Sequence, residues 1–337
     1  MNDNITKKRI LVVDPLEEKG HINFNRSLCA VASIDNDVFF MTGKSYSANV
    51  GFSNTICFYE FPRCLKTILH PRIVYIFYIF QIIFHLSKKR YDLIVFSSYD
   101  SMSFLLFWFF FREGRFALIN HNNLDFKGSK IKSFVFKCIP KRFYHVCLES
   151  YIAEYLENVF DKKTILMNHP IYIDVDEVVP EEIEVDSSDS VIVYSPSGSN
   201  KVFYVNKFLD FMPFDWFFVA KKTDVKQKEN ERCCYKEWFS NYYGYMKRSD
   251  IVFIGQDFGY RVSGVFYEAL SMKKRTIMPR CKFSEALIRR FPSSILFLEE
   301  DLFSDRHALE VSEEDYSQFI REHNDKSLRY QLDELLQ

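Results

Sequence analysis

The amino-acid sequence predicts an α/β fold made of two consecutive domains, each a doubly wound parallel sheet. Three observations predict it. The chain has 337 residues, about twice the usual length of one domain; short apolar runs rich in β-branched residues alternate with helical patterns; and the charge changes sign along the chain. Residues 1–166 hold 22 Lys and Arg against 15 Asp and Glu, and the remaining residues hold 22 against 30. This asymmetry indicates two lobes with different ligands, whereas the formal net charge of −1 gives no sign of nucleic-acid binding.

The first domain is predicted to span residues 1–168. Ile10–Asp14 is a short apolar run followed by a proline, which is typical of a buried parallel strand, and His21–Ser33 has helical spacing. The same strand pattern recurs at Val38–Thr42, Leu93–Ser97, Phe116–Asn120 and His145–Leu148. An acidic linker is expected over 169–190, because its residues 171–190 carry eight acidic residues and no Lys or Arg.

The second domain is predicted to span residues 191–311, and a charged helical tail is expected at 312–337. Its strands are expected at Val191–Ser195, Trp216–Ala220, Ile251–Ile254, Thr276–Met278 and Ile295–Leu298, and its helices at about 200–212, 232–248, 263–272 and 283–291. Strands that alternate with helices in this way favour a second parallel sheet.

Composition excludes several classes of protein. Only 10 residues are glycine, and neither a Walker A pattern nor an intact G-x-G-x-x-G is present, which argues against a glycine-rich nucleotide cradle and against a dehydrogenase. The eight cysteines include no C-x-x-C pair, so reduced thiols are expected. The polar start, Met1–Arg9, leaves no room for the apolar core of a signal peptide. These features favour a cytoplasmic protein.

Two aromatic runs raise the question of membrane contact. Ile73–Phe84 and Phe104–Phe111 are both shorter than the roughly 20 residues that span a bilayer. One interpretation is buried helices in an aromatic core. The other is a peripheral membrane face, because basic residues follow the first run, and 127–142 adds six basic residues and no acid.

In parallel sheets, ligands bind at the carboxyl ends of the strands. In the first domain, the loop after the first strand ends in Gly20 and His21 at a helix start, which suits a phosphate or acceptor loop, although Gly20 is equally well explained as an ordinary turn residue. His121 directly follows a strand and is a candidate catalytic residue, as a general base or as a hydrogen-bond donor to sugar or phosphate; the alternative is a capping or core histidine.

In the second domain, Ser197, Gly198 and Lys201 lie in the loop after its first strand and suit a diphosphate site, unless they are only a helix cap and a solvated lysine. Lys221 follows the next strand and adds positive charge at the same edge. Surface lysines of this kind are common, so Lys221 is weaker evidence for a diphosphate site than the loop with Ser197, Gly198 and Lys201.

The segment Gly255–Pro279 holds the most informative pattern. Arg261 can neutralise phosphate, and Ser263 and Gly264 open a helix whose amides can bind phosphate oxygens. Glu268 follows within the first turns, where a carboxylate can accept two ribose hydroxyls; the alternative is compensation of the helix dipole. Together these residues describe a nucleotide-diphosphate site.

The residues from Tyr260 to Leu270, followed by a short strand and a proline, resemble the donor-binding segment of GT-B glycosyltransferases. The resemblance implies two facing Rossmann-like domains, with the acceptor bound mainly by the first and a nucleotide-sugar by the second. It assigns Glu268 to the ribose, Arg261, Ser263 and Gly264 to the diphosphate, Lys201 and Lys221 to charge neutralisation, and His121 to the sugar or acceptor. Retaining members of the resembled family often carry a second glutamate where this chain has Tyr260, so the resemblance leaves open whether the anomeric centre is retained or inverted.

The expected function is therefore a metal-independent, hexosyltransferase-type glycosyltransferase that needs no cofactor beyond its nucleotide-sugar donor. Glycosyl transfer needs charge stabilisation on the departing phosphates, which amides and cationic side chains can supply without a metal. The basic, aromatic first domain suggests a lipid-linked glycan acceptor at the inner membrane face, in synthesis of a surface polysaccharide such as O-antigen or capsule. Two alternatives are a nucleotide-sugar epimerase, in which His121 does acid–base work, and a non-catalytic protein that docks at the membrane in an assembly.

Overall fold

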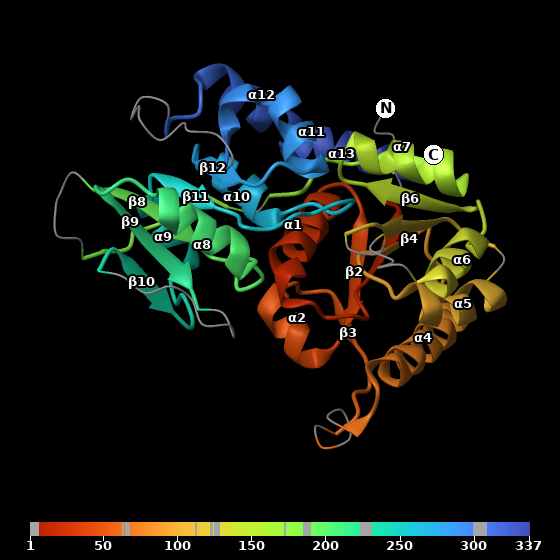
Figure 1. Ribbon diagram of the computed structural model, residues 1–337. Helices are drawn as coiled ribbons and strands as arrows, with labels where there is room; N and C mark the ends of the chain where they lie inside the picture. Colours follow the sequence, from red (N-terminus) through yellow and green to blue (C-terminus); the bar gives the residue numbers. More distant parts are fainter. Residues whose placement is uncertain are drawn as a thin grey trace. The chain divides into compact units, whose positions relative to one another are not determined.

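The computed structural model describes residues 7–62, 64, 68–111, 113–121, 124, 129–171, 173–184, 190–222, 231–298 and 309–337. The chain divides into two compact units (Figure 1). Unit 1 comprises Met1–Tyr172, Tyr260–Val262 and His323–Gln337, and unit 2 comprises Ile173–Gly259 and Ser263–Glu322. The expected boundary near residue 168 lies close to the first crossing between the units, whereas the segments 260–262 and 323–337 return to unit 1.

Unit 1 is built on a seven-stranded sheet, sheet A, in the order β3-β2-β1-β4-β5-β6-β7. All its strand pairs are parallel; Ile10, for example, pairs with Val38 on one side and with Leu93 on the other. The strands are β1 (Arg9–Val13), β2 (Asp37–Thr42), β3 (Thr55–Cys57), β4 (Leu93–Phe96), β5 (Phe116–Ile119), β6 (Phe143–Cys147) and β7 (Thr164–Leu166). The five predicted strands are confirmed, and β3 and β7 are two short edge strands that the sequence did not predict.

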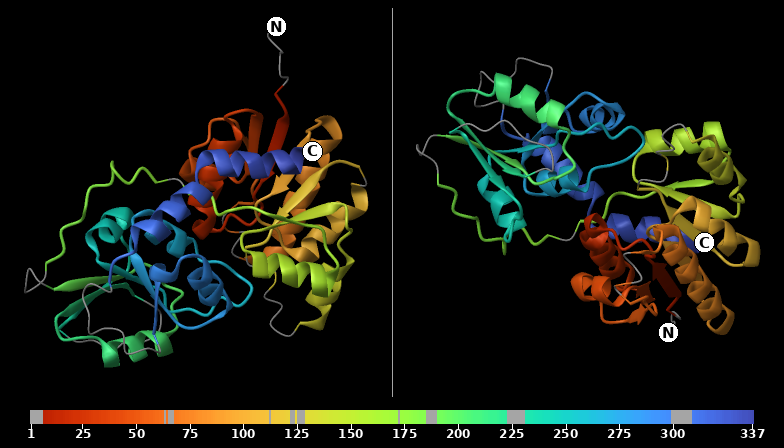
Figure 2. Two further views of the ribbon diagram at one scale, coloured as in Figure 1. Left: turned by 90° about the horizontal axis from the view of Figure 1, so that it is seen from above. Right: turned by 60° about the horizontal axis from the view of Figure 1, so that its bottom comes forward.

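Helices cover both faces of sheet A, because successive side chains of a strand point to opposite faces. Leu11 and Val13 pack with α4, α5, α6 and α7, whereas Ile10 and Val12 pack with α1, α2 and α13. The helices are α1 (Ile22–Ala32), α2 (Lys44–Val50), α4 (Pro71–Lys88), α5 (Ser101–Phe110), α6 (Lys130–Cys138), α7 (Ser150–Phe160) and α13 (Asp325–Leu336), and a 3-10 turn, η1 (Lys19–His21), precedes α1. The C-terminal helix α13 lies beside α1, although the two are far apart in sequence (Figure 1 and Figure 2).

Unit 2 is built on a six-stranded parallel sheet, sheet B, in the order β10-β9-β8-β11-β12-β13. Its strands are β8 (Val191–Ser195), β9 (Trp216–Lys221), β10 (Cys233–Lys236), β11 (Ile251–Phe253), β12 (Arg275–Met278) and β13 (Ile295–Phe297). Its helices are α8 (Val202–Phe211), α9 (Tyr242–Arg248), α10 (Gly264–Ser271), α11 (Lys282–Arg290) and α12 (Glu313–Glu322), with a 3-10 turn, η2 (Pro292–Ser294). The five predicted strands are again confirmed.

The helix expected over 232–248 is wrong in its first half. Cys233–Lys236 forms the edge strand β10, which pairs with β9 in the register Cys233↔Phe218, and only Tyr242–Arg248 is helical. Sheet pairing decides the structure here, because the half-buried run Cys233–Tyr235 completes the edge of sheet B. Tertiary context has overridden the local pattern.

The acidic segment 173–184 packs against α9 and belongs to unit 2, so it is more than a solvated linker. The Lys247 ammonium donates hydrogen bonds of 2.8 Å to the carbonyls of both Val175 and Val178. The Asn241 amide donates to the Glu181 carboxylate over 2.8 Å. Charge complementarity thus holds this segment, because its acidic and carbonyl oxygens meet donors on α9.

Candidate functional site

In unit 2, the loops that follow β8 and β11 are joined by hydrogen bonds. The side chain of Asn200 links them, because its Nδ2 donates to Ser195 Oγ over 2.6 Å and its Oδ1 accepts from the Gly255 amide over 2.9 Å. The Lys201 amide donates to the Gly255 carbonyl over 2.8 Å. Two of the segments that the sequence marked as donor-binding therefore meet at the carboxyl edge of sheet B, where parallel sheets bind ligands.

Two lysines bring positive charge to this edge. Lys201 is exposed and precedes α8 directly, at its N-cap position. Lys221 ends β9, and its Cδ would lie 3.5 Å from a Cβ on Gly198, so the lysine runs along the predicted phosphate loop. Its ammonium lies 5.2 Å from the ring centroid of Trp238. The structure thus places Ser197, Gly198 and Lys201 after β8 and Lys221 at the end of the adjacent strand β9, at one edge of the sheet, as an anion site requires.

Glu268 lies within α10 and is half-buried among tyrosines. Tyr242 donates to its Oε2 over 2.7 Å, and Tyr243 donates to its Oε1 over 3.0 Å. Burial, followed by the charge of Glu268, raises the pKa of both Tyr242 and Tyr194 far above the ordinary value, so both hydroxyls stay protonated. Each oxygen of the Glu268 carboxylate thus accepts a hydrogen bond from one tyrosine hydroxyl. The sequence analysis missed both donor tyrosines, because their contacts with Glu268 join two separate helices.

The predicted phosphate turn is divided between the two units. Tyr260 stacks on Tyr155 at 3.8 Å between ring centroids, and the Tyr151 hydroxyl donates to the Arg261 carbonyl over 2.8 Å, so this part belongs to unit 1. Ser263 begins the unit 2 portion as the N-cap of α10; it is buried, and its side chain makes no capping hydrogen bond. Tyr260, which stands where relatives of the resembled family have a second glutamate, thus has a packing role in unit 1.

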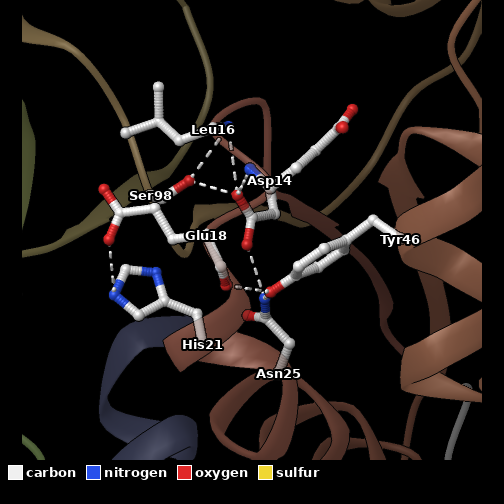
Figure 3. Close-up of polar contacts among 8 residues, drawn as sticks. Asp14, Leu16, Glu18, His21, Asn25, Tyr46 and Ser98 are labelled. Atoms are coloured by element: carbon white, nitrogen blue, oxygen red, sulfur yellow. Dashed lines mark hydrogen bonds and ion pairs between the residues drawn. The ribbon is translucent and has the colours of Figure 1, made fainter. Parts of the chain in front are cut away.

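In unit 1, Asp14 organises the loop after β1 (Figure 3). Its carboxylate is fully buried and accepts hydrogen bonds from the amides of Leu16 and Glu17, over 3.1 and 3.0 Å, from the Ser98 hydroxyl, and from Asn25 Nδ2 over 2.6 Å. Glu17 adopts a left-handed backbone conformation with φ of 55°, which this network holds in place.

This network bears on the expectation that the loop after β1 is a phosphate or acceptor loop. The amides of Leu16 and Glu17 already bind Asp14, and the loop carries three carboxylates, Asp14, Glu17 and Glu18, that would repel an anion. Gly20 is exposed in the 3-10 turn η1 that precedes α1, and nothing lies within 4 Å of a Cβ added to it. The roles of Gly20 and His21 therefore stay predictions, and the acidic charge of the loop favours a hydroxylated acceptor over a phosphate.

His21 and His121 are brought into contact. Their rings stack with centroids 4.2 Å apart, the edge of Phe24 packs on His121, and Glu18 lies 3.4 Å from His21 Nε2 (Figure 3). Burial, followed by the charges of His21 and His169, lowers the pKa of His121 well below its ordinary value. Among the residues that the structure describes, Nε2 of His121 has no hydrogen-bond partner although it is buried. A neutral imidazole of this kind suits hydrogen bonding to a ligand better than storage of a proton.

Asn120 fixes the strand end that carries His121. It accepts from the Tyr99 hydroxyl over 2.9 Å and donates to the carbonyls of Leu118 and Val146, so the carboxyl ends of β5 and β6 are held together. The position of His121 therefore depends on a buried polar network rather than on a mobile loop.

No group of three or more His, Cys, Asp or Glu within the described ranges could hold a metal ion. The sequence contains two Asp-x-Asp triplets, at residues 35–37 and 174–176. The first ends at Asp37, where β2 begins, and is thus at the amino edge of sheet A; the second lies in the segment packed on α9. Neither triplet lies at a carboxyl edge with the predicted donor residues.

A cavity of about 650 Å³ in unit 2 lies away from these residues. It is lined by Arg248, Asp250 and Lys274, among others, where β8, β11 and β12 begin. It therefore opens at the amino edge of sheet B, opposite to the edge that gathers Lys201 and Lys221.

Comparisons with solved structures find the same fold at low sequence identity. Sucrose-phosphate synthase from Thermosynechococcus elongatus is similar with a TM-score of 0.73 and 11% identity, and the match covers 98% of both chains. A glycosyltransferase from Rickettsia africae has a TM-score of 0.69 and 12% identity over 98% of both chains. HepE from Anabaena, in complex with UDP-glucose, has a TM-score of 0.68 and 10% identity over 98% of this chain and 99% of that one. No family model and no curated protein matches the chain. The two Rossmann-like units with parallel sheets of seven and six strands therefore form a GT-B fold, as the sequence resemblance predicted.

Proposed function

We propose that this protein is a glycosyltransferase that moves a sugar from a nucleotide-diphosphate donor to a lipid-linked glycan acceptor. One observation carries the proposal. The loops after β8, β9 and β11 gather Lys201, Lys221 and the Asn200–Gly255 link at the carboxyl edge of sheet B, in the unit that also carries Glu268. This is the arrangement that a diphosphate next to a ribose needs. The fold is shared with HepE, whose structure holds UDP-glucose.

The residues of unit 2 would act on the leaving group. Lys201 and Lys221 would neutralise the diphosphate as the glycosidic bond breaks, which lowers the barrier because charge develops on the phosphates. The amides at the start of α10, after Ser263 and Gly264, would add donors at a helix N-terminus. Arg261 is proposed to contribute a further cation. This chemistry needs no metal, so we expect transfer to persist in EDTA.

The residues of unit 1 would act on the acceptor. His121 would hydrogen-bond a sugar hydroxyl, because a buried imidazole with a strongly lowered pKa is neutral at physiological pH. The acidic loop with Glu18 and His21 would bind hydroxyl groups in the same way. We place the reaction at the cytoplasmic face of the cell membrane, in surface-polysaccharide synthesis, because unit 1 carries a basic and aromatic face.

Nucleotide binding is the first test. Titration calorimetry with UDP, GDP and ADP and their sugars should give saturable binding of one nucleotide by the full chain. Lys221→Met should weaken that binding by roughly tenfold, which corresponds to loss of one charge-assisted contact. Lys222→Met is the matched control, because the neighbouring Lys222 is exposed and lies 3.5 Å from Glu237 instead. Absence of binding to every nucleotide, or equal effects of the two variants, would overturn the proposal.

Product analysis separates the alternative activity. A transferase consumes donor only with an acceptor, apart from slow hydrolysis, whereas an epimerase converts the donor sugar alone. Nuclear magnetic resonance of the donor incubated with the protein should show no epimer. An epimer formed without acceptor would replace the proposed transfer by epimerisation.

A further inference from the structure

Three adjacent helices of unit 1 expose large apolar side chains to solvent. α4 contacts α5, and α5 contacts α6, and Figure 1 shows the three on one flank of sheet A. We call their outer surface the α4–α6 face. Its apolar side chains are between 48% and 71% exposed, and they are Ile73, Phe80, Phe84, Phe109, Phe110, Ile131 and Phe134.

On α4 these residues form one line. Ile73, Phe80 and Phe84 are spaced by seven and four residues, so they lie on the same side of the helix. Tyr78 and Ile82 lie on the opposite side and are buried against sheet A. A helix that faces water normally carries polar residues on its outer side. The outer line of α4 is instead apolar, which indicates that something covers it.

The charge of the α4–α6 face has a single sign. α4, α5 and α6 contain no Asp or Glu, and they carry Arg72, Lys88, Lys130, Lys132 and Lys137. Exposed Lys89 and Arg90 follow α4 directly. The Lys88 ammonium lies 3.8 Å from the ring centroid of Phe84, so cations and aromatic rings are interleaved.

Exposed apolar side chains together with basic charge indicate which kind of partner covers the α4–α6 face. A second copy of the chain packed face to face would place these basic residues against each other, because no acid on the three helices could pair with them. An anionic lipid surface satisfies both features, since its headgroups attract Lys and Arg while aromatic side chains enter the interface. None of the described helices is long and apolar enough to cross a bilayer.

We propose that the α4–α6 face docks on an anionic lipid bilayer, with Phe84, Phe109 and Phe134 inserted at the interface and the surrounding lysines on the headgroups. The proposed function supplies only the reason why the protein would dock, because a lipid-linked acceptor is presented at such a surface. Docking itself needs no sugar and is measured separately from transfer.

Vesicle cosedimentation of the full chain tests the proposal. We expect binding to vesicles of phosphatidylcholine and phosphatidylglycerol in equal parts, and much weaker binding to phosphatidylcholine alone. The variant with Phe84→Ser, Phe109→Ser and Phe134→Ser should lose most of this binding. Reversal of Lys88, Lys130 and Lys137 to Glu should lower the partition coefficient by roughly a hundredfold or more, because each basic residue contributes about a fivefold step at an anionic surface.

A matched control lies in unit 2, where Phe203, Phe211 and Phe214 on and after α8 are 61% to 93% exposed. Their triple replacement by Ser should leave vesicle binding unchanged. Equal losses in the two triple variants, or binding that ignores the anionic lipid, would overturn the proposal. So would a dimer in solution that the Phe84, Phe109 and Phe134 variant converts to monomer, because that result would make the face a contact between copies.

Nucleotide titration separates failure of docking from failure of the proposed function. The α4–α6 variants change unit 1 surface residues and should bind nucleotide as the unaltered protein does. Lys221→Met should bind vesicles normally while its nucleotide affinity falls. Vesicle binding without any nucleotide binding would leave docking intact and remove the transferase proposal.

Discussion

The Tyr242 hydroxyl donates a 2.7 Å hydrogen bond to Oε2 of Glu268, and Tyr242 is the first residue of α9. The bond fixes the carboxylate of α10 from a neighbouring helix. Tyr243 fixes the other oxygen over 3.0 Å. Two hydroxyl donors thus hold Glu268 in one orientation, which is the preorganisation that the proposed ribose contact needs.

Tyr242→Phe should therefore affect both stability and nucleotide binding. Loss of a hydrogen bond to a charged group costs about 1.5–3 kcal/mol of unfolding free energy. The carboxylate of Glu268 then loses one of its two tyrosine donors and is held less firmly, and we expect nucleotide affinity to fall by up to about tenfold. Urea unfolding and titration calorimetry measure the two effects.

Tyr245→Phe on the same helix is the matched control. Its hydroxyl bonds to Lys236 and not to Glu268. We expect that substitution to lower stability while nucleotide affinity stays unchanged. If both variants bind nucleotide normally, Tyr242 serves packing alone.

The core strands could be predicted from sequence because buried parallel strands are continuous apolar runs, as in Ile10–Val13 and Val191–Ser195. The edge strands β3, β7 and β10 could not, since they are short and only half-buried. Their pairing partners, which lie far away in sequence, determine them.

The candidate site was predictable to the extent that it follows strand ends. His121 follows β5, and Lys221 ends β9, so parallel topology alone places each at the carboxyl edge of its sheet. The partners that tune these groups were not predictable, because contacts such as Asp14 with Ser98 and Tyr242 with Glu268 join separate elements. Sequence patterns report periodicity and do not report which buried donors meet.

Asp14→Asn should destabilise unit 1 and release the loop after β1. The amide would present donors where the carboxylate now accepts from Asn25, Ser98 and two backbone amides, and we expect a loss of about 2–4 kcal/mol in unfolding free energy. Limited proteolysis should cut within residues 15–20 faster than in the unaltered protein. Asp35→Asn is the control, because its ion pair with Arg329 is nearly half exposed and contributes less than about 1 kcal/mol. Similar losses from the two substitutions would contradict the role of the Asp14 network.

Buried histidines should make unit 1 lose stability in mild acid. Burial, with a further contribution from a nearby charge, lowers the pKa of His145 and of His169 to about 3, and burial lowers that of His121 in the same direction. Below about pH 6.5 the unfolded chain binds protons that these folded rings do not. The free energy of unfolding therefore falls as pH falls from about 6.5 towards 3, by up to about 1.4 kcal/mol per pH unit for each histidine.

Hydrogen exchange of peptides from β5 and β6, measured from pH 7 to pH 5 after correction for intrinsic rates, checks this slope. His145→Gln removes one of the titrating rings. The unfolding free energy of this variant should therefore depend less steeply on pH, by the contribution of one histidine. His70→Asn is the control, because it replaces an exposed histidine and retains a capping side chain at the start of α4. A slope that neither substitution changes would show that other groups control acid stability.

Gly255→Ala should weaken the junction between the loops after β8 and β11. A Cβ at residue 255 would lie 2.6 Å from Cε1 of Phe253, whose ring is fully buried and cannot move aside without disturbing the core of unit 2. Overpacking of this kind costs about 1–3 kcal/mol, and it would also strain the 2.9 Å bond from the Gly255 amide to Asn200. Gly20→Ala is the matched control in unit 1, because nothing lies within 4 Å of the added Cβ.

Thermal unfolding should show a lower midpoint for Gly255→Ala and an unchanged midpoint for Gly20→Ala. Nucleotide affinity should also fall in Gly255→Ala, since the Asn200 link positions the loop that carries Ser197, Gly198 and Lys201. A Gly255→Ala protein with unchanged affinity would show that this link serves folding only.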